Sequence, residues 1–519
     1  MTGKPAARIT DKVAGGKIVT GSLTVLIGSQ GGIACSVCPG GQGVGSPVNP
    51  QLGAKVLTGS EDLDFALPGP LPVVWQRQYS SYINLEQGSR CGPLGHGWKL
   101  PQQLRIELTQ DDCLLHDAAG RTLTFGALAP GQSLYSASED IWIVRGGQEA
   151  AWHSEARWSH VPPSWAGSPD CILAASGNAA VVWAFAPVAA FEPALTPPAP
   201  QHWRLQAQLD RFGRSQRYTY APKPDAQETQ ETQKTQASRS KQATTGSELL
   251  QVHQAHQAPV PEGHLIGLTD GAGRSYRLHY QQVCSALPAN GLWGEDDGWR
   301  LASVELVSDP VGTGTLPLTL VHYGYDRTGQ LSTVHDRTGI VVREFAWQHR
   351  RMSSHRYASG PLHTYIYEST EPGARVIEHG NEQGLNYRFE YLKQNPSPAG
   401  LPQTATRVTD SLGRIDTYHY EGQAGLARLV RHQSADGSEL RYSYAAAGRL
   451  SSSTDPLGRT TRLQRDSQGQ LTSVQSPSDK PGGQRSCWRH LNSDPPGVRI
   501  KTWTGFMPQV QGSPGIRSG

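Results

Sequence analysis

The chain has 519 residues, with 58 Gly, 37 Pro, 18 Tyr and 13 Trp against only 8 Phe and 3 Met. This composition predicts many short strands and turns rather than helices, and the length exceeds what one hydrophobic core usually supports. The formal net charge of +3, spread along the chain, argues against a nucleic-acid or membrane-surface role. Seven scattered cysteines exclude a dense disulfide framework and fit synthesis in a reducing cytoplasm.

The N-terminal 44 residues begin with MTGKPAARITDK, which lacks the apolar stretch of a signal peptide. Their segment GGKIVTGSLTVLIGS has two β-branched runs, as in a small hairpin unit. Cys35 and Cys38 form a C-x-x-C pair, which supplies only half of a four-ligand zinc site, and the first histidine is His96. The pair is therefore a weak metal candidate, and we expect no cofactor. The longest apolar run, residues 179–191, is too short to cross a membrane.

Beyond residue 201 the sequence repeats short words in which Asp is followed three residues later by Gly, such as LDRFGRSQRYTY from Leu209 and VTDSLGRIDTYHY from Val408. One such word would indicate only a surface turn, whereas several with the same aromatic and Arg flanks indicate a repeat. The Asp side chain can accept backbone N–H groups and the Gly can take the left-handed conformation of a hairpin turn. The predicted turn residues are Asp210, Gly213, Asp270, Gly273, Asp326, Gly329, Asp336, Gly339, Asp410, Gly413, Gly437, Gly448, Asp455, Gly458, Asp466 and Gly469.

These turns share a period, since Gly437 and Gly458 are 21 residues apart and Gly448 and Gly469 repeat the interval. A unit of this size buries an apolar face only by stacking on its neighbours. We therefore predict an all-β protein whose repeats form an extended, spiralling antiparallel sheet, preceded by a small β-rich segment.

Two segments depart from the repeat pattern. Residues 222–261 are rich in Gln, Thr, Ser and charge, so we expect a disordered insert there. His253 and His256 in this insert have a chelating spacing but no partners, and we assign them no metal. Residues 478–519 contain no Tyr and little alternation, and we hypothesise that they are out-of-frame or rearranged coding sequence.

The run GSPVNPQLGAKVLTGSEDLDFALPGPLPVVWQRQYSSY at residues 45–82 and GPLGHGWKLP at 92–101 resemble the N-terminal block of bacterial Rhs proteins, and the Asp-x-x-Gly words resemble YD/Rhs repeats. The first forty residues resemble a short PAAR-like segment. The implied domains are a PAAR-like segment at 1–44, an Rhs N-terminal block at 45–200, YD/Rhs repeats at 201–477 with the insert at 222–261, and the atypical tail at 478–519.

The resemblance implies the non-catalytic shell of a secreted polymorphic toxin used in interbacterial competition. Its sheet would encapsulate a C-terminal toxin, and the PAAR-like segment would dock on a type VI secretion spike. Implied partners are the spike protein, the toxin and, for a full-length version, a cytoplasmic chaperone, with neither nucleic acid nor a membrane span. The family's self-cleavage region and toxin are not found here, so we expect a truncated shell. We expect it in the cytoplasm before delivery and then secreted without a signal peptide, with surface association as an option.

Catalytic motifs are missing from the sequence, which has no nucleophile elbow, H-E-x-x-H pair or phosphate-binding loop, so we expect no enzyme. Paired carboxylates such as Asp62 and Asp64 are interpreted as solvated or capping groups rather than as a glycosidase pair.

Four aromatic residues of the N-terminal block, Trp75, Tyr79, Tyr82 and Trp98, are interpreted as shell core rather than as a ligand platform. The alternative function is a cell-surface carbohydrate-binding or adhesion repeat protein. A row of exposed aromatic side chains would favour that alternative, and buried ones favour a wall.

Overall fold

The computed structural model describes residues 43–82, 91–188, 201–222 and 260–477, with short gaps inside these ranges. It also gives the backbone of β1 (Lys12–Val13), β2 (Gly16–Lys17) and β37 (Gln484–Cys487). The helices of this part of the chain are α1 (Pro163–Ala166), η1 (Ser60–Asp62), η2 (Pro101–Gln103), η3 (Ala151–Ser154) and η4 (Ala156–Trp158). The predicted all-β class is confirmed. Cys35, Cys38, nearly all of the insert and most of the tail lie outside the described residues.

One antiparallel sheet of 27 strands, β11 to β37, dominates the fold, and we call it the wall. Its strands follow one another in chain order, and β11 also pairs with β18, so the first eight strands close on themselves. These eight are β11 (Arg105–Leu108), β12 (Asp112–His116), β13 (Thr122–Gly126), β14 (Ser133–Ser136), β15 (Ile141–Arg145), β16 (Ile172–Ser176), β17 (Val181–Pro187) and β18 (Gln201–Asp210).

The repeat region supplies the rest of the wall as a series of hairpins. Its strands are β19 (Ser215–Tyr220), β20 (Leu265–Thr269), β21 (Ser275–Gln282), β22 (Trp299–Ser308), β23 (Leu318–Tyr325), β24 (Leu331–Asp336), β25 (Val341–Gln348), β26 (Arg351–Tyr357), β27 (His363–Tyr367), β28 (Val376–Asn381), β29 (Asn386–Gln394), β30 (Gln403–Asp410), β31 (Ile415–Glu421), β32 (Arg428–Gln433), β33 (Glu439–Tyr444), β34 (Leu450–Thr454), β35 (Thr460–Arg465), β36 (Leu471–Pro477) and β37.

The turns have a recurring geometry. Asp210 accepts the backbone N–H groups of Phe212 (2.9 Å) and Arg214 (3.0 Å) through Oδ1 and pairs with the Arg214 side chain through Oδ2. Gly213 has φ of 76°. The same Asp and Arg pairing recurs at Asp270, Asp410 and Asp455. Positive φ also occurs at Gly273, Gly329, Gly339, Gly413, Gly437, Gly448 and Gly458.

Two of the predicted turn glycines follow a first residue other than Asp, and one predicted glycine is not described. The turns that end at Gly437 and Gly448 begin at Ser434 and Ala445, whose carbonyl groups accept the glycine N–H. Gly469 lies outside the described residues.

Tyrosines tie the two strands of a hairpin together. In five hairpins a Tyr hydroxyl at the end of the second strand donates to a backbone carbonyl 15 residues upstream. The pairs are Tyr220 with Leu205 (2.6 Å), Tyr280 with Leu265 (3.0 Å), Tyr367 with Met352 (2.9 Å), Tyr391 with Val376 (2.5 Å) and Tyr444 with Leu429 (2.7 Å). At four of these tyrosines the register with the following strand shifts. Such bulges bend a sheet and increase its twist, so they help the wall to curve.

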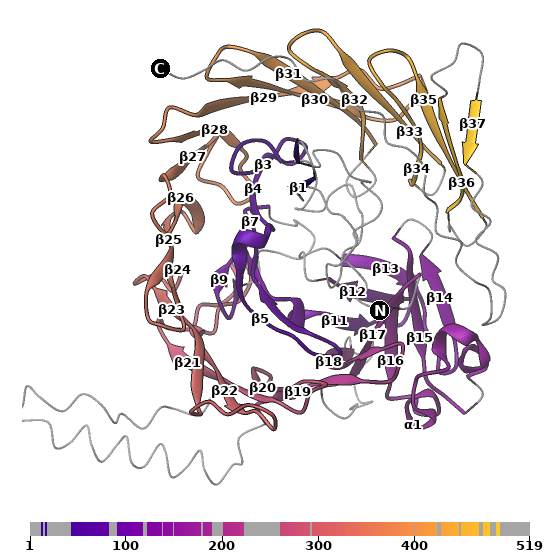
Figure 1. The fold of residues 1–519 in the computed structure, drawn as a ribbon, viewed down its shortest axis with the longest axis vertical. Helices are drawn as coiled ribbons and strands as arrows, with labels where there is room; N and C mark the ends of the chain where they lie inside the picture. Colours follow the sequence, from indigo (N-terminus) through magenta and orange to yellow (C-terminus); the bar gives the residue numbers. More distant parts are fainter. Residues whose placement is uncertain are drawn as a thin grey trace, which may run out of the picture.

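The wall follows a ring in Figure 1, from β11–β18 through β22 and β29 to β36. Side chains near the last strands of the wall contact residues of its first strands. Arg449, directly before β34, lies 3.3 Å from the Asp140 carboxylate and donates to the Tyr135 hydroxyl of β14 (3.1 Å). The repeats thus come back to the strands where the sheet began.

Residues 43–82 and 91–100, which we call the inner segment, lie inside this ring (Figure 1). Their strands are β3 (Val48–Asn49), β4 (Ala54–Leu57), β5 (Leu63–Leu67), β6 (Val73–Gln76), β7 (Gln78–Ser80), β8 (Cys91–Gly92), β9 (Gly95–His96) and β10 (Trp98–Lys99). One hydrophobic cluster joins Trp75 and Trp98 of the inner segment to Tyr323 and Met352 of the wall. The inner segment and the wall therefore share a core.

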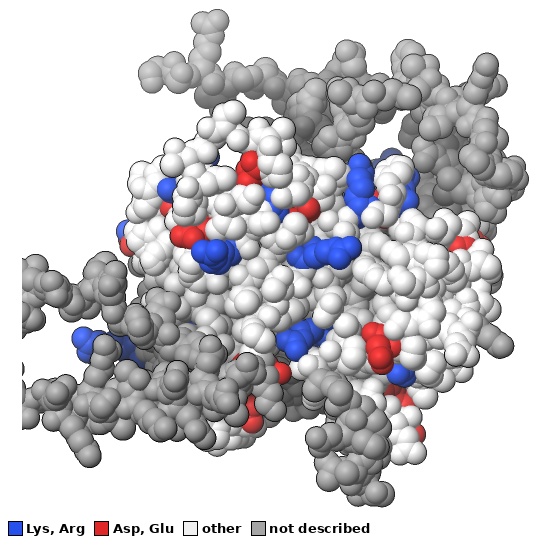
Figure 2. Space-filling view, turned by 90° about the horizontal axis from the view of Figure 1, so that it is seen from below, with Lys and Arg blue, Asp and Glu red and all other residues white. Residues whose placement is uncertain are grey.

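Charged residues on the outside are mixed in sign. Figure 2 shows basic and acidic groups interspersed over a largely uncharged face. Several form exposed cross-strand pairs, such as Arg407 with Glu390 (2.9 Å), which contribute little to stability. Among the residues that the structure describes, no helix combines the length and apolar character needed to cross a membrane.

Candidate functional site

The contact between the inner segment and the wall contains many of the buried polar groups among the described residues. At its centre Arg77 pairs with Asp64 (2.8 Å), both side chains being almost fully buried. The wall residue Tyr323 donates its hydroxyl to Asp64 (2.6 Å) and accepts the indole N–H of Trp75 (2.9 Å). Because a buried charge is tolerated only when it is paired and hydrogen-bonded, this network fixes one position of the inner segment on the wall.

Asp62 extends the network towards β26. Its carboxylate accepts the hydroxyl of Tyr357 (3.0 Å). Burial raises the pKa of Asp62 to about 6, although the positive charges of Arg77 and Lys55 act in the opposite direction. The interpretation of Asp62 and Asp64 as solvated or capping groups is wrong, since both are buried where the inner segment meets the wall.

Lys55, on β4, is fully buried. Its ammonium group donates to the carbonyl groups of Ser46 and Val56 and lies 4.7 Å from the centre of the Tyr365 ring. Burial lowers the pKa of Lys55 well below its ordinary value. The hydroxyl of Tyr365 also donates to the Ser46 carbonyl, so β27 holds this part of the inner segment directly.

Three wall histidines, His355, His363 and His379, form a stack of rings beside Lys55, which we call the histidine column. Neighbouring ring centres are 5.0 and 5.6 Å apart. His379 accepts the backbone N–H of Ser46 through Nε2 (3.2 Å). Burial lowers the pKa of all three, that of His379 to about 4. The column is therefore neutral at pH 7.

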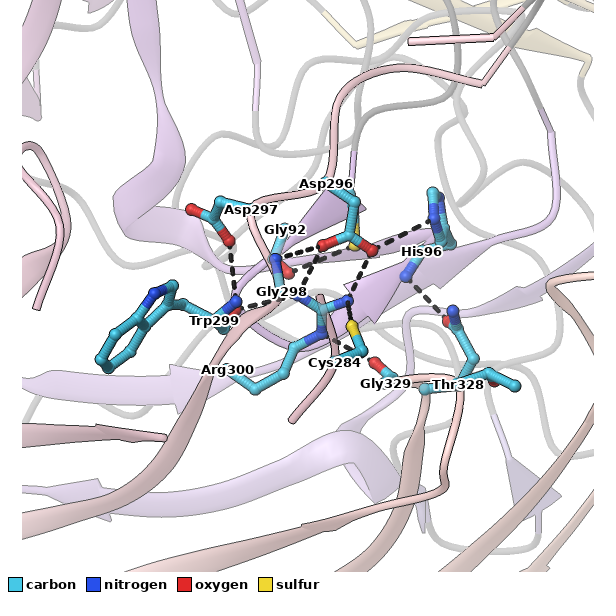
Figure 3. A network of polar contacts seen from close by, with 12 residues as sticks. Gly92, His96, Cys284, Asp296, Asp297, Gly298, Trp299, Arg300, Thr328 and Gly329 are labelled. Carbon is cyan, nitrogen blue, oxygen red and sulfur yellow. Dashed lines mark hydrogen bonds and ion pairs between the residues drawn. The ribbon is translucent and has the colours of Figure 1, made fainter. Parts of the chain in front are cut away.

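A second polar network holds the β8–β9 hairpin (Figure 3). Arg300 of β22 makes two hydrogen bonds to the Asp296 carboxylate (2.9 and 2.7 Å) and one to the Gly329 carbonyl (2.7 Å). The backbone N–H of His96 donates to the side chain of Gln330 (3.0 Å), and Pro93 accepts the N–H of Leu301 (2.7 Å). The hairpin is thus bound to the wall on both sides.

Potential metal ligands also meet here. One ligand atom each of Cys91, His96 and Asp296 lie within 4.8 Å of one another. Burial raises the pKa of the Cys91 thiol, and burial lowers that of His96 to about 4. Cys35 and Cys38, the metal candidates predicted from the sequence, lie outside the described residues.

The four aromatic residues that the sequence predicts to lie in the shell core divide into two groups. Trp75, Tyr79 and Trp98 are buried, whereas Tyr82 has 42% of its surface exposed. The first three belong to the core that joins the inner segment to the wall, and Tyr79 accepts the N–H of Met352 (2.9 Å). Sequence reasoning missed the buried partners Arg77 and Tyr323, because their positions follow no local pattern.

Two protein-family models match the chain. One, described as a domain of unknown function (DUF6531), covers residues 45–125, and the RHS Repeat model covers residues 444–480. Toxin protein Tse5 of Pseudomonas aeruginosa is 35% identical over 492 residues, which are 92% of this chain and 31% of that protein. Double-stranded DNA deaminase toxin A of Burkholderia cenocepacia is 26% identical over 380 residues, 73% of this chain and 20% of that protein. The chain thus spans about a third or less of these relatives.

Solved structures of TcdB2-TccC3 also match. The complex with Cdc42 aligns with 10% identity and a TM-score of 0.20, covering 79% of this chain and 21% of the matched chain. The sequence matches agree with the resemblance found in the turn words and in the N-terminal block. The chain belongs to the RHS-repeat proteins, and its relatives include bacterial toxins.

Proposed function

We propose that this chain is the shell and delivery portion of an Rhs polymorphic toxin. In this proposal the wall surrounds a toxin that is not part of this chain, and the segment 1–44 docks on a type VI secretion spike. A cytoplasmic chaperone would act on a full-length version, and the shell itself would carry out no catalysis. The similarity to toxin protein Tse5 over 92% of the chain supports this assignment.

The observation that carries the proposal is the curved wall with its inner segment. The wall turns through a ring and touches its own first strands through Arg449 and Asp140, while the inner segment packs on the inside. A sheet that returns towards its start has an inward face, and such a face suits contact with an enclosed polypeptide.

The alternative, a carbohydrate-binding or adhesion array, predicts a row of exposed aromatic residues. Among the described residues, the aromatic side chains with large exposed fractions are Tyr82 and Phe212, one in the inner segment and one in a turn. The tyrosines of the repeats, such as Tyr276, Tyr323 and Tyr418, are buried. Their burial favours a wall.

The test is a competition assay with the native locus, including the sequence downstream of this chain. Donor cells carry the wild-type locus or a deletion of residues 1–44, each with an active or an inactivated type VI secretion system. The proposal expects killing of recipient cells only by the wild-type locus with the active system. Killing that persists without the secretion system, or without residues 1–44, would contradict the delivery route.

A cell-binding measurement separates the two candidate functions. Purified protein is incubated with recipient cells and with a panel of immobilised glycans. The shell proposal expects no saturable binding to either. Saturable glycan binding that is lost on Tyr82→Ala would favour the adhesion alternative.

A further inference from the structure

The β8–β9 hairpin places a thiol and an imidazole next to each other. Cys91 and His96 are direct cross-strand partners, and the Gly92–Gly95 pair closes the turn between them. Side chains of directly opposed residues lie on the same face of a hairpin. Asp296 reaches this face from the loop that joins β21 to β22, and the three ligand atoms all lie within 4.8 Å of one another. The hairpin and the loop thus bring together side chains that lie about 200 residues apart in the sequence.

We propose that Cys91, His96 and Asp296 bind one divalent metal ion of the zinc type, which fastens the inner segment to the wall. Thiolate, imidazole and carboxylate are the three side-chain ligands that proteins use for zinc, at about 2.0–2.3 Å from the metal. In a tetrahedral site such bonds place ligand atoms about 3.3–3.7 Å apart. The distance from His96 Nε2 to the nearer oxygen of Asp296 is 3.8 Å. The other pairs of ligand atoms lie within 4.8 Å, so metal binding would draw the ligands together by up to about 1 Å, and a water molecule would complete the fourth position.

The neighbouring groups orient these ligands. Arg300 makes two hydrogen bonds to Asp296, and the N–H of Gly298 donates to the same carboxylate (2.9 Å). Hydrogen bonds behind a metal ligand fix its direction and raise affinity. The ring of Trp293 packs edge-on against His96, with ring centres 5.2 Å apart. With a divalent ion bound, the Cys91 thiolate and the Asp296 carboxylate would neutralise the metal, and Arg300 would hold the Asp296 carboxylate in place.

A metal at this position would act as a structural clip. It would join residues 91 and 96 of the inner segment to residue 296 of the wall and so close a loop of about 200 residues. Clips that close long loops remove much conformational freedom from the unfolded chain. The clip does not depend on the proposed delivery function, and its failure would leave that function untouched.

The test uses the full chain with Cys35→Ser and Cys38→Ser, so that the C-x-x-C pair cannot account for bound metal. Protein from zinc-supplemented cultures is analysed by inductively coupled plasma mass spectrometry, and one zinc per chain is expected. Cys91→Ser and His96→Gln should each weaken zinc binding at least about 100-fold, since even changes behind the ligands cost about 10–100-fold. Absence of zinc from the parent protein would overturn the proposal.

The matched control is Cys171→Ser, a buried thiol in the wall far from Asp296 in sequence. It should keep zinc, and loss from both cysteine variants alike would contradict the assignment to Cys91. Cobalt replacement gives a second readout, because a thiolate ligand produces an ultraviolet charge-transfer band that Cys91→Ser should abolish. A cobalt complex of the parent without this band would also overturn the site. A chelator should lower the Tm of the parent and leave that of Cys91→Ser unchanged.

Discussion

Acid should loosen the inner segment, and the histidine column supplies the reason. His379 accepts the N–H of Ser46 and stacks on His363 and Tyr365, in a pocket tight enough that a Cβ atom on Gly45 would lie 2.5 Å from the His379 ring. The charge of Lys55 also disfavours protonation of these rings. A proton on His379 would remove its acceptor from Ser46 and place a second cation beside Lys55.

The pKa values give the direction and the size of the change in folding stability with pH. The folded state lowers the pKa of His379 from 6.5 to about 4, so it binds fewer protons than the unfolded chain at mildly acid pH. Its contribution to stability is complete above pH 6.5 and is lost as the pH falls towards 4. The loss amounts to about 2 kcal/mol at pH 5. Asp62, with its pKa raised to about 6, opposes this by about 1 kcal/mol at the same pH. His355 and His363 act in the direction of His379, so a net loss remains.

The assay is urea unfolding followed by tryptophan fluorescence, at pH 7 and at pH 5. The perturbation is His379→Gln, whose amide oxygen can still accept the Ser46 N–H without gaining a proton. The wild type should lose stability between the two pH values, and the variant should lose about 2 kcal/mol less. His202→Gln, at a side chain that is 56% exposed, is the control and should change nothing. An equal loss in His379→Gln and the wild type would refute the reasoning.

The remaining predictions concern the turns, the hairpins and the central ion pair. Gly458→Val should destabilise the protein by about 1–2 kcal/mol, because a β-branched residue strains at φ of 75°; thermal unfolding against the wild type checks this, and an unchanged Tm would count against the turn geometry. Tyr444→Phe should cost about 1 kcal/mol through its lost hydrogen bond, measured by urea unfolding. Asp64→Asn should cost about 3–5 kcal/mol because Arg77 keeps a buried charge, whereas a loss under 1 kcal/mol in urea unfolding would argue against that pairing.

The turns could be predicted from the sequence because their chemistry is local. Asp210, Gly213 and Arg214 lie within five residues, and each performs its task on groups in the same turn. The bond from the Tyr hydroxyl to the carbonyl 15 residues upstream is also nearly local. A search for Tyr at that distance from an apolar strand residue would have found it in the sequence.

The candidate site could not be predicted in the same way. Trp75 and Tyr323 are 248 residues apart, and Arg274 donates to the carbonyl of Pro68 across 206 residues. No sequence periodicity relates such pairs, because their contact depends on how the wall curves around the inner segment. The resemblance identified an N-terminal block at residues 45–200 but did not indicate that Asp62 and Asp64 would be buried between this block and the repeats.

The position of the inner segment inside the wall affects whether the repeats can fold without it. In a linear array each repeat contacts only its neighbours and nearest-neighbour terms add up to the stability. Here Tyr323 and Met352 of the wall are buried in a cluster with Trp75 and Tyr79 of the inner segment. A wall without the inner segment would expose this apolar surface and would leave Tyr323 without the carboxylate of Asp64. The inner segment therefore acts as part of the core on which the repeats fold. Residues 101–477, the wall without the inner segment, should aggregate when expressed alone, whereas residues 43–477 should remain soluble and unfold in one transition.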